Sequence, residues 1–254
     1  MTYDYHGKVV IITGGGRGMG AGVTAAVAKS GATTIITGRT EAPLQALCQQ
    51  LRQDHQADIH YQVADGSDEA RVKEVVAWVA KTFGRIDAII NNAQAEVHGV
   101  PLEEQSKETF DLAFQTGVYA SFYYMKACFP YLKESKGTII NMGSGAGIAG
   151  LNGFASYAAG KEAIRGLTRV AATEWSQYGI NSNTICPSVA SAALLEWKEL
   201  HPEEAAAVMA GTPMRDFADG ELHVGGTCLF LMSPEAKFIT GRNLDVDGGQ
   251  YLRP

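Results

Sequence analysis

The chain has 254 residues, of which 46% are hydrophobic and 19% charged, and its formal net charge is -6 at pH 7. This length and composition suit one α/β domain, which we expect to span residues 1–254. The acidic balance argues against a nucleic-acid partner, which would favour a basic face. No run of about 18 apolar residues occurs, so the sequence predicts neither a membrane span nor a membrane partner.

The N-terminus and the cysteines indicate the compartment. Residues 1–8 are largely polar and lack the basic and then apolar order of a signal peptide. Cys48, Cys128, Cys186 and Cys228 lie far apart without a C-x-x-C pair, a pattern typical of neither a zinc site nor a disulfide framework. We therefore expect a cytoplasmic protein without a metal site.

Short apolar runs alternate with amphipathic stretches along the chain. The runs predict strands at residues 9–12, 34–36, 59–63, 86–90, 138–140 and 180–185, and the stretches between them predict helices at 20–30, 43–55, 68–83, 107–133 and 154–178. Consecutive apolar residues are typical of parallel strands that are covered on both faces. The sequence therefore predicts an α/β fold: a single doubly wound parallel sheet, Rossmann-like, of about seven strands with helices on both faces.

Residues 190–218 break this alternation. The stretch is rich in Ala and Glu and carries Leu194, Leu195, Trp197 and Met209. It is interpreted either as a small helical lid inserted over the substrate or as a helical hairpin on the surface.

A glycine-rich turn follows the first predicted strand, with the sequence Thr13-Gly14-Gly15-Gly16-Arg17-Gly18-Met19-Gly20. Glycine lets a phosphate approach the backbone N–H groups at the positive end of the next helix, where a Cβ would block it. Three glycines can also make a simple tight turn, but the first strand-to-helix junction of an α/β chain is where such ligands bind. We expect a dinucleotide here.

Tyr157 and Lys161 are four residues apart in a predicted helix, so their side chains share one face. An ammonium near a phenol is expected to lower the phenol pKa and make it usable as an acid or base. Ser144 follows the fifth predicted strand, where its hydroxyl can hydrogen-bond a substrate oxygen. The three are predicted to be the catalytic residues.

The pattern T-G-x-x-x-G-x-G, the run Asn91-Asn92-Ala93, the Tyr157/Lys161 pair and the sequence Val246-Asp247-Gly248-Gly249 occur in this order. Together they resemble the short-chain dehydrogenase/reductase family over nearly the whole chain. The resemblance implies a nicotinamide-dependent oxidoreductase in which Tyr157 exchanges a proton with the substrate oxygen and Lys161 holds the nicotinamide ribose. It assigns the cofactor to Gly14, Arg17, Gly18, Met19, Gly20, Arg39, Asp65, Asn91, Ala93, Tyr157, Lys161, Pro187 and Val189.

The second predicted strand is followed by Gly38 and Arg39. Enzymes that select NAD usually place Asp or Glu near this point to bind the ribose hydroxyls. With that acid absent, the Arg39 and Arg17 guanidinium groups are suited to the 2′-phosphate of NADP. The prediction is a preference for NADP(H), with NAD(H) as the other candidate.

Two positions of the cofactor set have a second interpretation. The resemblance implies that Asp65 accepts a hydrogen bond from the adenine amino group, which leaves Ser67 to cap the following helix, although Asp65 is itself a candidate cap. Asn91 is expected, with Ala93, beside the adenosine ribose, but it can equally tie neighbouring strands together.

The chain departs from the family pattern at four positions. Gln94 stands where the family has a glycine, and Gly117 aligns with an asparagine that supports a water-linked proton path to the lysine. Ser188 replaces a glycine, and Ala192 replaces a threonine that binds the carboxamide. We expect an active enzyme with an altered proton relay, with Gln115 and Thr116 as candidates to hold the water.

The candidate substrate residues are Gln94, Gly145, Ala146, Leu151 and Trp197. Largely apolar walls favour a ketone or secondary alcohol on a hydrophobic, alicyclic, aromatic or steroid-like molecule. Alternatives are a 3-oxoacyl thioester reductase and a catalytically weak protein that binds or senses NADP(H). Apolar residues on several faces of the helices at 107–133 and 154–178 favour a homo-oligomer, and the resemblance implies a dimer or tetramer.

Overall fold

The computed structural model describes residues 3–190, 196 and 198–252. Its strands form one seven-stranded parallel sheet, in the order β3-β2-β1-β4-β5-β6-β7. The strands are β1 (Val9–Thr13), β2 (Thr33–Gly38), β3 (Ile59–Val63), β4 (Ala88–Asn91), β5 (Thr138–Met142), β6 (Asn181–Pro187) and β7 (Asn243–Val246). The predicted doubly wound parallel sheet is confirmed. The chain runs outward from β1 to β3 and returns to place β4 on the other side of β1, so the strand order reverses between β1 and β4.

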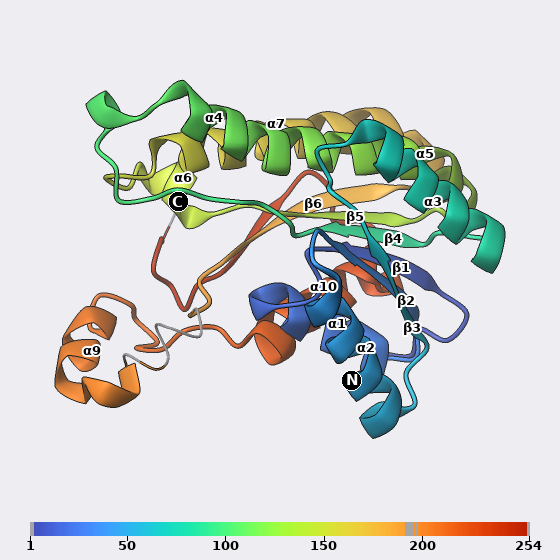
Figure 1. Cartoon of the computed structure of the whole chain (residues 1–254), viewed down its shortest axis with the longest axis horizontal. Helices are drawn as coiled ribbons and strands as arrows, with labels where there is room; N and C mark the ends of the chain where they lie inside the picture. Colours follow the sequence, from blue (N-terminus) through green and yellow to red (C-terminus); the bar gives the residue numbers. More distant parts are fainter. Residues whose placement is uncertain (1–2, 191–195, 197, 253–254) are drawn as a thin grey trace.

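Helices cover both faces of the sheet (Figure 1). The α-helices are α1 (Gly18–Lys29), α2 (Glu41–His55), α3 (Glu69–Phe83), α4 (Lys107–Ala113), α5 (Ala120–Ser135), α6 (Gly145–Ala149), α7 (Ala155–Trp175), α9 (Pro202–Met209) and α10 (Gly226–Met232). Short 3-10 turns are η1 (Leu102–Glu104), η3 (Ser176–Tyr178) and η5 (Pro234–Ala236), and two π-helical segments are η2 (Phe114–Tyr119) and η4 (Gly220–Gly225). No helix in the described ranges is both long and apolar enough to cross a bilayer.

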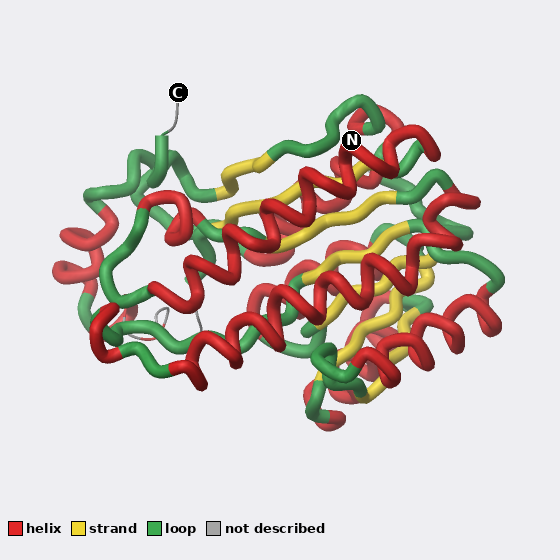
Figure 2. The backbone as a smooth tube through the Cα atoms, turned by 90° about the horizontal axis from the view of Figure 1, so that it is seen from above, coloured by secondary structure: helices red, strands yellow, loops and turns green. Residues whose placement is uncertain are grey.

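The apolar residues of β1 explain why helices cover both faces of the sheet. Val10 and Ile12 belong to the core shared with α1, α2 and α10, whereas Val9 and Ile11 belong to the core shared with α3, α5 and α7. Successive side chains of a strand point to opposite faces, so a fully apolar strand must be covered on both. Figure 2 shows α5 and α7 lying along the sheet on one side.

The helix predicted over residues 107–133 is interrupted, and the prediction of one regular helix is wrong. The π-helical segment η2 separates α4 from α5, with Gly117 buried at its centre. The hydroxyl of Thr116 also donates to the Leu112 carbonyl oxygen at 2.7 Å, a local bond that competes with regular helix bonding. A wide turn with an inserted residue is typical of functional sites.

Two further predictions concern the cap of α3 and the stretch 190–218. The side chain that caps α3 is Asp68, which accepts from the N–H groups of Ala70 and Arg71, so the assignment of that cap to Ser67 is wrong. In the stretch 190–218, the described residues form α9, which projects from the end of the sheet away from the covering helices (Figure 1). Leu194, Leu195 and Trp197 lie outside the described residues, and the lid remains a prediction.

Candidate active site

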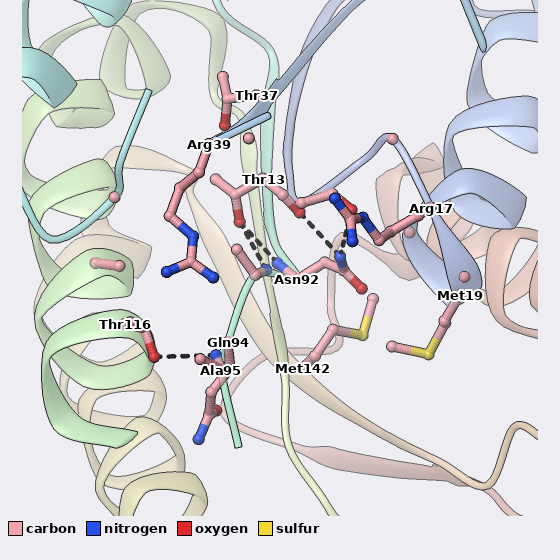
Figure 3. Close-up of a pocket in the computed structure, with 18 of the residues that line it drawn as sticks. Thr13, Arg17, Met19, Thr37, Arg39, Asn92, Gln94, Ala95, Thr116 and Met142 are labelled. Carbon is pink, nitrogen blue, oxygen red and sulfur yellow. Dashed lines mark hydrogen bonds between the residues drawn. The ribbon is translucent and has the colours of Figure 1, made fainter. Parts of the chain in front are cut away.

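A cavity of about 960 Å³ opens at the carboxyl ends of the central strands. Its lining comes from the glycine turn after β1, the ends of β2 and β3, the loop after β4, the π segment η2, helix α7 and the end of β6. Figure 3 shows several of these side chains converging on the space between the glycine turn and η2. The cavity lies where the strand order reverses, the position at which open α/β sheets bind ligands.

The glycine turn is shaped for an anion. Gly14 and Gly18 have positive φ angles of 65° and 53°, and a Cβ on Gly20 would lie 2.2 Å from the carbonyl oxygen of Gly14. Arg17 is the N-cap of α1, yet no side chain caps this helix end and its first turn contains no acidic residue. The N–H groups of the first turn are therefore free to face a phosphate.

The side chain of Asn92 holds this turn in place. Its amide nitrogen donates to the carbonyl oxygens of Thr13 and Gly14 at 2.9 and 3.2 Å. In return, the Thr13 hydroxyl oxygen accepts from the backbone N–H groups of Asn92 and Ala93, both at 3.0 Å (Figure 3). These reciprocal bonds join the ends of β1 and β4. In the sequence Asn92 stands out only as a member of the Asn91-Asn92-Ala93 run, and its role becomes visible in the fold.

Charged groups line the far end of the cavity. Arg17 and Arg39 are exposed, and neither forms an ion pair with a described carboxylate. Burial raises the pKa of Asp65, but hydrogen bonds from the Ser67 N–H and hydroxyl, with a smaller effect of Arg39, bring it below its usual value. Asp65 is therefore an ionised acceptor at the cavity wall, and the two guanidinium groups are available to an anion.

Tyr157 and Lys161 line the inner end of the cavity, and Ser144 lies next to Tyr157 but outside the lining. Ser144 is the N-cap of α6, and its hydroxyl forms a hydrogen bond with the Tyr157 side chain. Lys161 is buried, its Nζ donates to the Met142 carbonyl oxygen at 2.8 Å, and the same atom lies 5.4 Å from the centroid of the Tyr157 ring. The structure thus brings the three predicted catalytic side chains together, from the N-cap of α6 and from α7.

The charge state of this cluster differs from the expectation. Burial raises the pKa of Tyr157 to about 12; the Ser144 hydrogen bond opposes this, and Glu96 adds to it. Burial also lowers the pKa of Lys161 to about 8, while the Glu96 charge acts in the opposite direction. The expected lowering of the Tyr157 pKa is therefore wrong for this structure, because the loss of hydration of the phenolate on burial dominates.

Most of the predicted cofactor residues line the cavity. They are Gly14, Arg17, Gly18, Met19, Gly20, Arg39, Asp65, Ala93, Tyr157, Lys161, Pro187 and Val189. Asn91, expected beside the ribose, is buried outside the lining: its amide nitrogen donates to Asn141 Oδ1 at 2.7 Å. Its side chain has the strand-tying role, and Asn92 stands in the lining instead.

The predicted substrate residues are divided. Gln94 lines the cavity, whereas Gly145, Ala146 and Leu151 lie outside its lining. Ala146 is buried with its N–H on the Ser144 hydroxyl oxygen, and a Cβ on Gly145 would lie 2.2 Å from the ring of Tyr251. Trp197 is outside the described residues.

Glu96 is a wall residue that the sequence analysis missed. It lines the cavity and acts on the pKa of both Tyr157 and Lys161. Its position, five residues beyond the end of β4 in a loop without periodicity, gave no signal. Only the folded chain shows that this carboxylate lies near enough to Tyr157 and Lys161 to act on their charge states.

Comparison with known proteins identifies the class. The family model described as Enoyl-(Acyl carrier protein) reductase matches residues 14–250. A 12alpha-hydroxysteroid dehydrogenase from Clostridium sp. (strain ATCC 29733 / VPI C48-50) is 46% identical, with 98% of this chain and 99% of that protein covered. The chain belongs to the short-chain dehydrogenase/reductase family and is an oxidoreductase of CH–OH groups.

Solved structures show the same fold with either nicotinamide. The structure of NAD+-bound xylitol dehydrogenase matches with a TM-score of 0.87 and 26% identity, covering 96% of this chain and 99% of that one. The structure of ElxO with NADP bound matches with a TM-score of 0.88 and 27% identity, covering 96% and 98%. The family uses NAD(P) cofactors, and these two structures leave the choice between NAD and NADP to the residues of this chain.

Proposed function

We propose that this protein is an NADP(H)-dependent oxidoreductase that interconverts a ketone and a secondary alcohol on an alicyclic, steroid-like molecule. The observation that carries the proposal is the cluster of Ser144, Tyr157 and Lys161, in which Tyr157 and Lys161 line the same cavity as the glycine turn. This arrangement would suit a reaction in which a bound nicotinamide supplies a hydride and Tyr157 supplies a proton.

Each of the three side chains has its own role in the proposed reduction. When bound, the cofactor supplies the hydride. Tyr157, protonated at neutral pH because burial raises its pKa to about 12, gives its proton to the substrate oxygen. Ser144 hydrogen-bonds the phenol, which positions its oxygen for the same transfer. Lys161 is fixed by the Met142 carbonyl, and its positive charge stabilises the phenolate that remains.

The preference for NADP(H) is supported by the end of β2. Gly38 offers no carboxylate to ribose hydroxyls, and Arg39 lines the cavity without an ion-pair partner among the described carboxylates. A guanidinium binds a phosphate through two parallel hydrogen bonds, whereas the ribose hydroxyl of NAD offers no such charge.

The substrate class is supported by the surface beside the phenol. Phe154 packs edge-on against Tyr157 with ring centroids 6.1 Å apart, and stacks on His98 at 5.4 Å. Two flat rings next to a proton donor, one of them the apolar ring of Phe154, suit a rigid ring system as substrate. The hydroxysteroid dehydrogenase that shares 46% of its residues over the full length gives the same class.

The test is a cofactor and substrate panel with a matched pair of variants. NADPH and NADH oxidation are measured with a ketosteroid, a monocyclic ketone, a keto-sugar and a 3-oxoacyl thioester, and we expect NADPH with the ketosteroid to react fastest. Tyr157→Phe should lower turnover by roughly 100-fold or more while NADPH still binds. Tyr178→Phe is the control, because Tyr178 packs on Phe129 and Lys133 away from the cavity.

Each failure has a separate meaning. Faster oxidation of NADH refutes the role given to Arg39, and a faster sugar or thioester refutes the substrate class. Unchanged turnover in Tyr157→Phe refutes the proton transfer, and no turnover at all with intact NADPH binding favours a sensor.

The proposal includes a cytoplasmic homo-oligomer, a dimer or tetramer. Tyr119 at the end of η2, Phe122 of α5 and Val170 of α7 are exposed by 43%, 40% and 53%, which supports the prediction that these helices pair between copies. Sedimentation velocity measures the assembly, and a monomer at micromolar concentration would refute it.

A further inference from the structure

Gln94 places a buried, unpartnered amide beside the catalytic pair. Its side chain lines the cavity, yet both Oε1 and Nε2 are closed off from solvent, and neither has a hydrogen-bond partner among the described residues. A buried amide without partners is unfavourable, so such groups in native proteins are satisfied by another molecule. Water or a ligand in the cavity is the available source.

The amide lies between two glycines. A Cβ on Gly117 would lie 2.7 Å from Cδ of Gln94 and 2.8 Å from its Oε1, and a Cβ on Gly160 would lie 3.4 Å from its Nε2. Gly117 is the centre of the π segment η2, and Gly160 directly precedes Lys161 in α7. Gln94 and Gly117 are therefore a coupled pair, since a larger residue at 117 requires the glutamine to leave.

The loop that carries Gln94 is fastened to the π segment. The backbone N–H of Ala95 donates to the Thr116 hydroxyl oxygen at 3.0 Å, as Figure 3 shows. That hydroxyl gives its own hydrogen to the Leu112 carbonyl oxygen. Thr116 is therefore occupied, and Gln115 is exposed outside the cavity lining, so neither suits the water-holding role for which both were candidates.

Lys161 needs further hydrogen-bond acceptors. An ammonium has three N–H donors, and among the described residues its only hydrogen-bond acceptor is the Met142 carbonyl oxygen. The side chain is fully buried, so the other two donors point into the protein or the cavity. A Cβ on Gly160, the residue before Lys161, would lie 3.4 Å from Gln94 Nε2, so the Gln94 amide lies beside the helical turn that leads into Lys161, and both side chains line the same cavity.

We propose that Gln94 is a positioning residue for Lys161: its carboxamide holds the water molecule that links the Lys161 ammonium to solvent. This inference rests on the proposed function. In ketone reduction the O–H bond of Tyr157 breaks and the O–H bond of the product alcohol forms. The lost proton is replaced from solvent along a path whose water sits between the Gln94 amide and Lys161, with no net change on either side chain. Gln94, on the loop after β4, thus provides the amide that Gly117 in η2 lacks.

The first test replaces the amide with an apolar group of similar size. In Gln94→Leu, kcat for ketone reduction should fall roughly 10- to 100-fold, the range of one hydrogen bond to a charged group, while the Kd for NADPH stays unchanged. Gln115→Leu is the matched control on the exposed side of η2 and should keep the wild-type kcat. Wild-type kcat in Gln94→Leu overturns the inference, as does a loss confined to NADPH binding.

A readout independent of turnover separates this inference from the proposed function. NMR titration of the Lys161 side chain should show a lower pKa in Gln94→Leu, because the charged form loses a hydrogen-bonded water. An unchanged Lys161 pKa overturns the inference even in an active enzyme. Conversely, a lower pKa in a chain that reduces no ketone supports the role of Gln94 and refutes only the proposed function.

A double variant at positions 94 and 117 tests whether the lost activity can be restored. Gln94→Gly should lose kcat, and Gly117→Asn alone should lose it through collision with Gln94. Together the two changes move the amide from the loop to the helix, and kcat should recover at least 10-fold over Gln94→Gly. This comparison also covers the case in which Gln94→Leu does not fold. Additive losses in the double variant would overturn the proposed exchange of places.

Discussion

The hydroxyl of Thr13 offers the sharpest test of how the cofactor turn is built. Thr13 is 5% exposed at the end of β1, and its oxygen accepts from the N–H groups of Asn92 and Ala93, both at 3.0 Å. Thr13→Val keeps the shape of the side chain and removes the acceptor. Leaving a buried donor unsatisfied costs about 1–3 kcal/mol, so two donors together should cost about 2–6 kcal/mol of unfolding free energy.

Thr13→Ser is the matched control. It keeps the oxygen and loses one methyl group, at a cost of about 1 kcal/mol. Urea unfolding followed by circular dichroism at one fixed protein concentration gives both values, and the Kd for NADPH reports on the turn itself. The valine variant should be the less stable of the two and should bind NADPH more weakly, since Asn92 no longer holds the Gly14 carbonyl in place. Equal stability of the two variants would refute this account of the turn.

Three further outcomes follow from the site. Arg39→Met should raise the Kd for NADPH by roughly 10-fold or more and leave that for NADH unchanged, as fluorescence titration would show, because only the 2′-phosphate needs the guanidinium. For ketone reduction, kcat/KM should be level near neutral pH and decline as pH rises through about 8, since Lys161 then loses its charge while Tyr157 stays protonated; a rise above pH 8 would contradict this. Glu96→Gln should move that decline to lower pH, because the Glu96 carboxylate raises the Lys161 pKa; a shift to higher pH would show that Glu96 acts in another way.

The sequence by itself determined the sheet and the glycine turn, and it singled out Ser144, Tyr157 and Lys161 as candidates that the fold brings together. Strands such as β1 are apolar on consecutive residues, so both faces must be covered, and this local pattern identifies a parallel sheet without tertiary information. Ser144, Tyr157 and Lys161 were identifiable because their spacing and order along the chain reflect where α7 begins relative to β5. The pairing of Tyr157 with Lys161 is a property of one helix and needs no distant partner.

Only the tertiary structure decided the pKa of Tyr157 and the positions of the side chains on the loop after β4. The pKa of Tyr157 depends on how deeply the phenol is buried, and burial is contributed by residues from several elements. The role of Gln94 depends on its meeting Gly117, 23 positions away, inside a π-helical turn that residue periodicity does not predict. The loop after β4 carries Asn92, Gln94 and Glu96. It has no hydrophobic periodicity from which the orientation of these side chains could be predicted. Their positions follow from hydrogen bonds to Thr13 and Thr116, which form only when the ends of β1, β4 and the η2 segment come together.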